Sequence, residues 1–68
     1  MCFLIHLHRN KETKLFQATA GQLFDYSDNR ITIQSDDCSD IDDAIQSVLY
    51  RLNQKVKDPV ITVYCYNP

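Results

Sequence analysis

The sequence predicts an α+β domain in which one amphipathic helix packs on one face of a small sheet. Three patterns predict this class: residues 2–9 alternate with a period of two, residues 40–57 repeat apolar side chains at helical spacing, and residues 60–66 return to a period of two. We expect about four to five strands in the order β-β-β-β-α-β, with residues 1–68 forming a single domain. The sheet is expected to be antiparallel, or mixed if its last strands pair in parallel.

Residues 2–9 form the first expected strand. Phe3, Ile5 and Leu7 fall on one face and Leu4, His6 and His8 on the other, as in a strand with one buried face. The polar connector 10–13 has the length of a hairpin turn, and residues 14–20 resume an extended pattern. The first two strands are therefore expected to pair.

Gly21 is the only glycine of the chain, and it follows the second expected strand. A glycine inside a strand pattern commonly supplies a backbone angle that other residues resist, so we expect a bend or bulge there. Residues 22–26 then run extended, residues 27–29 have turn chemistry, and residues 30–34 return. This pattern predicts a second hairpin.

Residues 40–57 carry the clearest structural pattern. Their apolar side chains recur at intervals of three and four residues, which places them on one stripe of a helix. That stripe consists of Ile41, Ala44, Ile45, Val48, Leu49, Leu52 and Val56. Ser39, followed three residues later by Asp42, resembles a capping box, and the pair Asp58 and Pro59 ends the helix.

One helix can cover only one face of the sheet, so the other face is expected to be open to water or to a partner. From the alternation of the strands we expect His6, His8, Thr32, Tyr64 and Tyr66 to share this open face. The exposed aromatic and imidazole groups suggest a contact surface for a larger protein or for a second copy of the chain.

The negative charge is concentrated in one segment. The chain has a net charge of −2, yet residues 35–43 hold five aspartates and no basic residue. The acidic total disfavours binding to nucleic acid or to an anionic membrane. We expect Asp36, Asp37, Asp40 and Asp43 to form an acidic contact with a basic protein surface, while helix capping also explains Asp40 and Asp43.

The three cysteines, Cys2, Cys38 and Cys65, cannot all pair within one chain and lie in no Cys-x-x-Cys motif. A reducing, cytoplasmic compartment fits this usage best. The apolar run at residues 2–7 is too short for a signal-peptide core, and no stretch has the length of a membrane span.

No catalytic or cofactor motif stands out, so we expect no enzyme, no cofactor and no catalytic residue. Cys38 precedes a helix N-terminus, which lowers a thiol pKa, but its acidic neighbours oppose that shift. His6 and His8, with Cys2 on the same side of the strand, define a small metal-binding protein as one alternative. The acidic segment lacks the glycine and glutamate of an EF-hand.

The function expected from these patterns is a small stand-alone protein-binding module. Its concrete form is an inhibitor or adaptor that occupies a surface of a larger protein, of the kind that phages and mobile elements encode against host or defence proteins. Self-association through the open face or an edge strand is a further expectation. The alternative from a different class is a sheet platform for single-stranded nucleic acid, with Tyr64 and Tyr66 stacking on bases.

Overall fold

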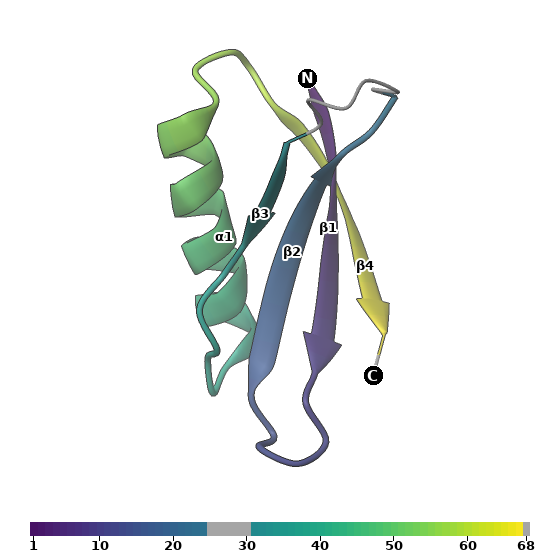
Figure 1. Ribbon diagram of the computed structural model, residues 1–68, viewed down its shortest axis with the longest axis vertical. Helices are drawn as coiled ribbons and strands as arrows, with labels where there is room; N and C mark the ends of the chain where they lie inside the picture. The colour runs from purple at the N-terminus through teal and green to yellow at the C-terminus, as the bar shows by residue number, and fades with distance from the viewer. Residues whose placement is uncertain (25–30, 68) are drawn as a thin grey trace.

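The computed structural model describes residues 1–24 and 31–67. It contains the elements β1 (Cys2–Arg9), β2 (Phe16–Gln22), β3 (Thr32–Gln34), α1 (Ile41–Lys55) and β4 (Ile61–Asn67). The strands form one sheet in the order β3-β2-β1-β4, and α1 packs on one of its faces (Figure 1). The predicted α+β class, with one helix on a small sheet, is confirmed.

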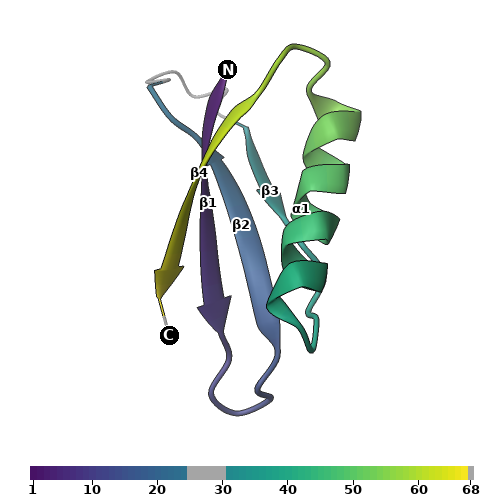
Figure 2. The same cartoon turned by 180° about the vertical axis from the view of Figure 1, so that it is seen from behind.

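The sheet is mixed because the two neighbours of β1 run in opposite directions. It pairs with β2 antiparallel and with β4 parallel. The strands β3 and β4, which flank the helix in sequence, therefore lie at opposite edges of the sheet. Seen from behind, α1 lies beside β3 and β2, and β4 is the strand farthest from it (Figure 2). The helix consequently leaves β4 uncovered.

The expected bulge at Gly21 is wrong. Gly21 pairs in register with Leu4 on one side and Thr32 on the other, and its φ is not positive. Residues on both sides of Gly21 therefore belong to one continuous strand, β2, rather than to two. The extended run ends near Phe24, which takes a left-handed φ of 62°. The predicted turn at residues 27–29 lies outside the described residues.

The core lies between α1 and the sheet. The helix contributes the buried side chains of Ala44, Val48 and Leu52, which agrees with the predicted apolar stripe. The fully or nearly buried apolar residues are Phe3, Ile5, Leu7, Ala18, Ala20, Ile33, Ala44, Val48, Leu52 and Val56. Small alanines on β2 let the helix approach the sheet closely, since no bulky side chain separates the two layers.

The N-terminal cap of α1 differs from the predicted one. Asp40, rather than Ser39, has the extended backbone of a cap residue, and its carboxylate accepts a hydrogen bond of 3.3 Å from the backbone N–H of Asp42. Asp42 and Asp43 follow in the first turn, where carboxylates stabilise the positive end of the helix dipole. The helix ends at Lys55, two residues before the predicted end.

The segment after β3 is held against β2 by Ser35, the one buried polar residue among those described. Its hydroxyl accepts a hydrogen bond of 2.9 Å from the backbone N–H of Ala18 and donates one of 2.9 Å to the carbonyl of Asp36. Phe16 and Cys38 then form an isolated bridge, with backbone hydrogen bonds of 2.6 and 2.8 Å. These contacts fix the path of the acidic segment.

Candidate interaction surface

The edge strand β4 is apolar and exposed. It contains no charged residue, and the exposed fractions of its larger side chains are 68% for Ile61, 49% for Val63, 48% for Tyr64 and 46% for Tyr66. The exposure follows from the position of α1, which packs over β2 and β3. Edge strands of natural proteins commonly carry a charge or a proline that blocks pairing with another chain, and β4 has neither between Ile61 and Asn67.

The register of β4 divides its side chains between the two faces. Val63 lies beside Leu4, on the open face, whereas Tyr64 lies beside Ile5, on the face that α1 covers elsewhere. Tyr66 lies on that same covered side, beside Leu7. The prediction that Tyr64 and Tyr66 share a face with His6 and His8 is therefore wrong. The alternation alone could not reveal this, because both sets of β4 side chains are largely apolar.

The outer edge of β4 offers backbone groups for pairing. The N–H of Ile61 donates to the carbonyl of Met1 at 2.8 Å, so Ile61 directs its backbone groups toward β1. Because these directions alternate along a strand, the N–H and C=O groups of Thr62, Tyr64 and Tyr66 point away from the sheet. Among the described residues, no chain segment pairs with that edge.

The opposite edge of the sheet is less suited to pairing. Its strand, β3, is three residues long and exposes the polar side chains of Thr32 and Gln34. Short and polar edge strands resist addition of a further strand. The two edges therefore differ in kind, and β4 is the edge that favours contact with another chain.

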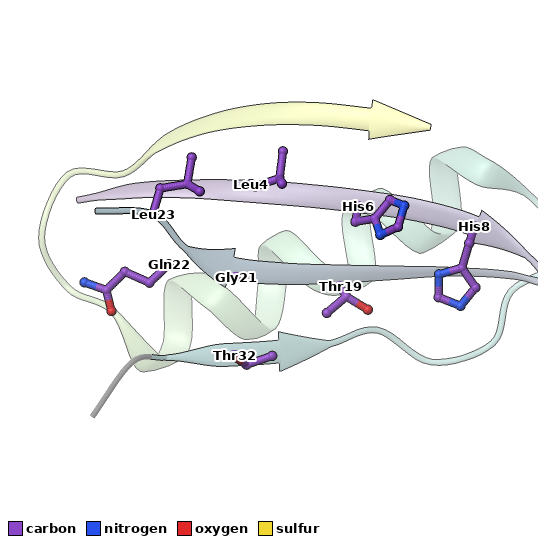
Figure 3. Close-up of a pocket in the computed structure, with 8 residues that line it drawn as sticks. All are labelled: Leu4, His6, His8, Thr19, Gly21, Gln22, Leu23 and Thr32. Atoms are coloured by element: carbon purple, nitrogen blue, oxygen red, sulfur yellow. The ribbon is translucent and has the colours of Figure 1, made fainter. Parts of the chain in front are cut away.

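The open face of the sheet carries a shallow hollow of about 440 Å³ (Figure 3). Gly21 forms its floor, Leu4 and Leu23 lie toward one end, and His6 and His8 lie toward the other. His6, His8 and Thr32 thus share this face, as predicted from the alternation. A Cβ atom added at Gly21 would meet nothing within 4 Å, so packing does not require the glycine.

The two imidazole rings of the hollow lie close together, with 6.1 Å between the ring centroids of His6 and His8. Cys65 is the register neighbour of His6 on the same face. Within residues 1–24 and 31–67, however, no three His, Cys, Asp or Glu side chains lie close enough to hold one metal ion.

The acidic segment is partly occupied by structural contacts. Arg51 bonds through Nη2 to the carboxylate of Asp36 at 2.5 Å and through Nη1 to the carbonyl of Gln34 at 2.9 Å. Asp40 caps the helix, as described above. Asp37 and Asp43 are exposed, and among the described residues their carboxylates accept no hydrogen bond. Of the four predicted acidic contact residues, these two remain fully available to a partner.

The thiol of Cys38 lies among carboxylates that change its pKa. Desolvation raises its pKa above the ordinary value, and the carboxylates of Asp43, Asp36 and Asp37 raise it further, against a smaller opposing effect of Arg51. The Sγ atom also donates a hydrogen bond of 3.3 Å to the carbonyl of Asp36. Cys38 is therefore held as a neutral thiol, which is a poor nucleophile.

A second concave site, of about 230 Å³, lies where β1 and β4 end. It is lined by Arg9, Lys11, Lys14 and Tyr66. A weak signal for it is present in the sequence, since Arg9 falls on the apolar side of the first strand and two lysines lie in the segment that follows. The approach of Tyr66 from β4, however, depends on the parallel pairing, which the sequence does not specify.

Comparisons of the chain with models of protein families, with curated proteins and with solved structures found no match. In the part of the chain that the structure describes, no helix has the length and apolar character needed to cross a membrane.

Proposed function

We propose that this protein is a non-enzymatic binding module that adds its β4 edge to a strand of a larger protein, as an inhibitor or an adaptor. The observation that carries the proposal is β4 itself, a strand of 7 residues without charge whose side chains are exposed on both faces. A long, apolar and unprotected edge is costly for a protein to keep, because it promotes aggregation. Its presence is accounted for if the edge is covered in the functional complex.

Strand addition supplies both affinity and specificity. The outward backbone groups of Thr62, Tyr64 and Tyr66 would form main-chain hydrogen bonds with the added strand. The side chains of β4 would contact side chains of the added strand on both faces of the sheet, with Tyr64 on one face and Val63 on the other. Tyrosine is enriched at such contacts because its large ring has few rotatable bonds and a polar end.

The acidic residues Asp37 and Asp43 fit a secondary role in this proposal. Exposed carboxylates steer association with a basic surface and contribute more to the rate of encounter than to affinity. The three free cysteines agree with a cytoplasmic setting for the complex. A second copy of the chain is the alternative partner for β4, since two uncharged strands pair without like-charge repulsion.

The other functions considered from the sequence have less support. A nucleic-acid platform on the open face requires aromatic rings there, and the register places Tyr64 and Tyr66 on the other side. A metal site at His6 and His8 requires further ligands, and the described residues bring no third one within reach.

The test compares two substitutions at Tyr64 in a pull-down from the native host cell. Tyr64→Pro removes an outward N–H without removing a hydrogen bond to β1, and proline is tolerated at such positions of edge strands. Tyr64→Ala removes the ring and keeps the N–H. We expect a specific partner to be lost with Tyr64→Pro and weakened with Tyr64→Ala.

Tyr50→Ala, which removes an exposed tyrosine on the far side of α1, serves as the matched control. Circular dichroism confirms that each variant is folded. Retention of the partner by Tyr64→Pro at the level of the unmodified protein would refute strand addition. A concentration-dependent increase in mass in light scattering, abolished by Tyr64→Pro, would identify a second copy as the partner.

A further inference from the structure

The cleft formed by Arg9, Lys11, Lys14 and Tyr66 lies at the carboxyl ends of the two parallel strands, β1 and β4 (Figure 1). The cleft is separate from the open face, since its strand residue Arg9 lies on the side of the sheet that carries α1. It shares Tyr66 with β4, but it uses the ring of that residue, whereas strand addition uses its backbone groups.

The loop that supplies the two lysines has a fixed backbone. The side chain of Asn10 accepts hydrogen bonds from the N–H groups of Glu12 and Thr13 at 2.8 and 3.2 Å. The carbonyl of Asn10 accepts a further one of 2.7 Å from Lys14, which takes a left-handed φ of 60°. A residue other than glycine is strained in this conformation, so the loop holds Lys14 in place at some cost.

The third cation is also oriented by its surroundings. The guanidinium carbon of Arg9 lies 5.6 Å from the centre of the Phe16 ring, within the range of a cation–π contact. A guanidinium held against an aromatic ring keeps N–H groups with which it can bind an anion. Three cationic side chains and one tyrosine ring therefore converge on one small recess.

Within residues 1–24 and 31–67, no carboxylate forms an ion pair with a cation of the cleft. The one ion pair among the described residues joins Arg51 to Asp36, so Arg9, Lys11 and Lys14 have none, even though Glu12 lies in the same loop. The chain as a whole has a net charge of −2, and the acidic first turn of α1 lies at the same end of the molecule (Figure 1). Salt screens charges that lie more than about 8–10 Å apart. The three cations therefore attract an anion that enters the cleft, although the chain as a whole is acidic.

We propose that this cleft binds a nucleotide, with the phosphate held by Arg9, Lys11 and Lys14 and the base stacked on the ring of Tyr66. A volume of about 230 Å³ is smaller than most ligand sites, so the cleft holds the phosphate and one face of the base and leaves the rest of the nucleotide in solvent. Arginine and lysine side chains are the usual phosphate ligands, and stacking of a base on an aromatic ring adds affinity without sequence preference. The nucleotide is either a free mononucleotide or the phosphorylated end of a single strand.

The experiment titrates the isotope-labelled protein with adenosine monophosphate at low salt and follows amide chemical shifts. Adenosine and inorganic phosphate test the two halves of the ligand separately. We expect shifts in residues 9–16 and around Tyr66 with the monophosphate, weaker binding of each half, and an affinity that falls as salt is added. A 5′-phosphorylated oligonucleotide that binds more tightly than the monophosphate would identify a strand end as the ligand.

Two double variants with the same charge change test the site. Lys11→Gln with Lys14→Gln is expected to weaken binding about tenfold, since each lysine contributes a charge-assisted hydrogen bond. Lys55→Gln with Lys57→Gln removes two cations from the opposite end of the molecule and is expected to leave the affinity unchanged. Tyr66→Leu separates stacking from charge, because it should weaken the monophosphate and leave phosphate unaffected.

Equal affinities for the two double variants, or no shift in the cleft residues at millimolar monophosphate, would overturn the proposal. Both results leave the proposed binding through β4 intact, because Lys11 and Lys14 lie in the loop between β1 and β2 and contribute nothing to strand addition.

Discussion

Ile5 and Tyr64 are neighbours in register across the parallel strands β1 and β4 and point to the same face of the sheet, yet Ile5 is completely buried while Tyr64 is 48% exposed. The difference arises because α1 crosses β2 and β3 and extends no further than β1. A single helix is too narrow to cover a sheet of four strands, since strands are spaced about 4.8 Å apart and a helix is about 10 Å across. The uncovered strand is the surface on which the proposed function depends.

The helix cap provides a test of the local structure. Asp40→Ala should lower the free energy of unfolding by about 1 kcal/mol, because the substitution removes the side-chain acceptor for the N–H of Asp42. Ser39→Ala should change it by less than about 0.5 kcal/mol. Urea denaturation of the two variants measures the difference. A larger loss with Ser39→Ala would show that Ser39 is the cap, as the sequence pattern suggested.

The core should be sensitive to the loss of one side chain. Leu52 is 1% exposed, and Leu52→Ala should cost about 2–5 kcal/mol through lost burial and the cavity left behind. That cost is comparable with the total stability of a domain of this size, so we expect the variant to be largely unfolded. Tyr50→Ala, on the exposed side of the same helix, should change stability by less than about 0.5 kcal/mol. Thermal melts that rank the two variants in the reverse order would contradict the described core.

Gly21 allows a test that separates the open face from the β4 edge. Gly21→Ala should raise the free energy of unfolding by about 0.4–1 kcal/mol, since the backbone is regular, the site is open and alanine restricts the unfolded chain. Partner binding should be unchanged if β4 is the contact. Loss of binding with a stability equal to or above that of the unmodified protein would instead place the partner in the hollow above Gly21.

The raised pKa of Cys38 predicts slow reaction of its thiol. At neutral pH the exposed Cys65 should be alkylated by iodoacetamide before Cys38, because thiolate is the reactive form. The folded-state pKa of Cys38 lies above its ordinary value, so the stability that the neutral thiol contributes is present below the ordinary value and is lost as the pH rises through the folded-state pKa. Mass spectrometry of the labelled peptides measures the order. Faster labelling of Cys38 would mean that the helix N-terminus outweighs the neighbouring carboxylates.

The sequence predicted the helix and the first strand because both have strong local patterns. The helical spacing of seven apolar side chains predicts α1 to within two residues at its C-terminal end, and the alternation of residues 2–9 predicts β1. Gly21 misled the prediction because a glycine in a strand more often marks an irregularity than an open face. Strand propensity alone could not show that Gly21 pairs in regular register with β1 on one side and with β3 on the other.

The candidate site was harder to predict because it depends on contacts between distant parts of the chain. The faces of β4 cannot be assigned from composition, since Ile61 and Val63 are as apolar as the tyrosines between them. The pairing of Arg51 with Asp36 joins residues 15 positions apart across the start of the helix, so the acidic segment looked more available than it is. The predicted face was correct for His6 and His8, because the residues that alternate with them in β1 are strongly apolar and must face the core.

Amide hydrogen exchange along β4 tests the central claim most directly. In the free protein the N–H groups of Val63 and Cys65, which point toward β1, should exchange slowly, while those of Thr62, Tyr64 and Tyr66 exchange rapidly. On addition of the partner identified by pull-down, the rapid set should slow by at least about tenfold, because those groups then donate to the added strand. Continued rapid exchange of Thr62, Tyr64 and Tyr66 in the saturated complex would contradict the account.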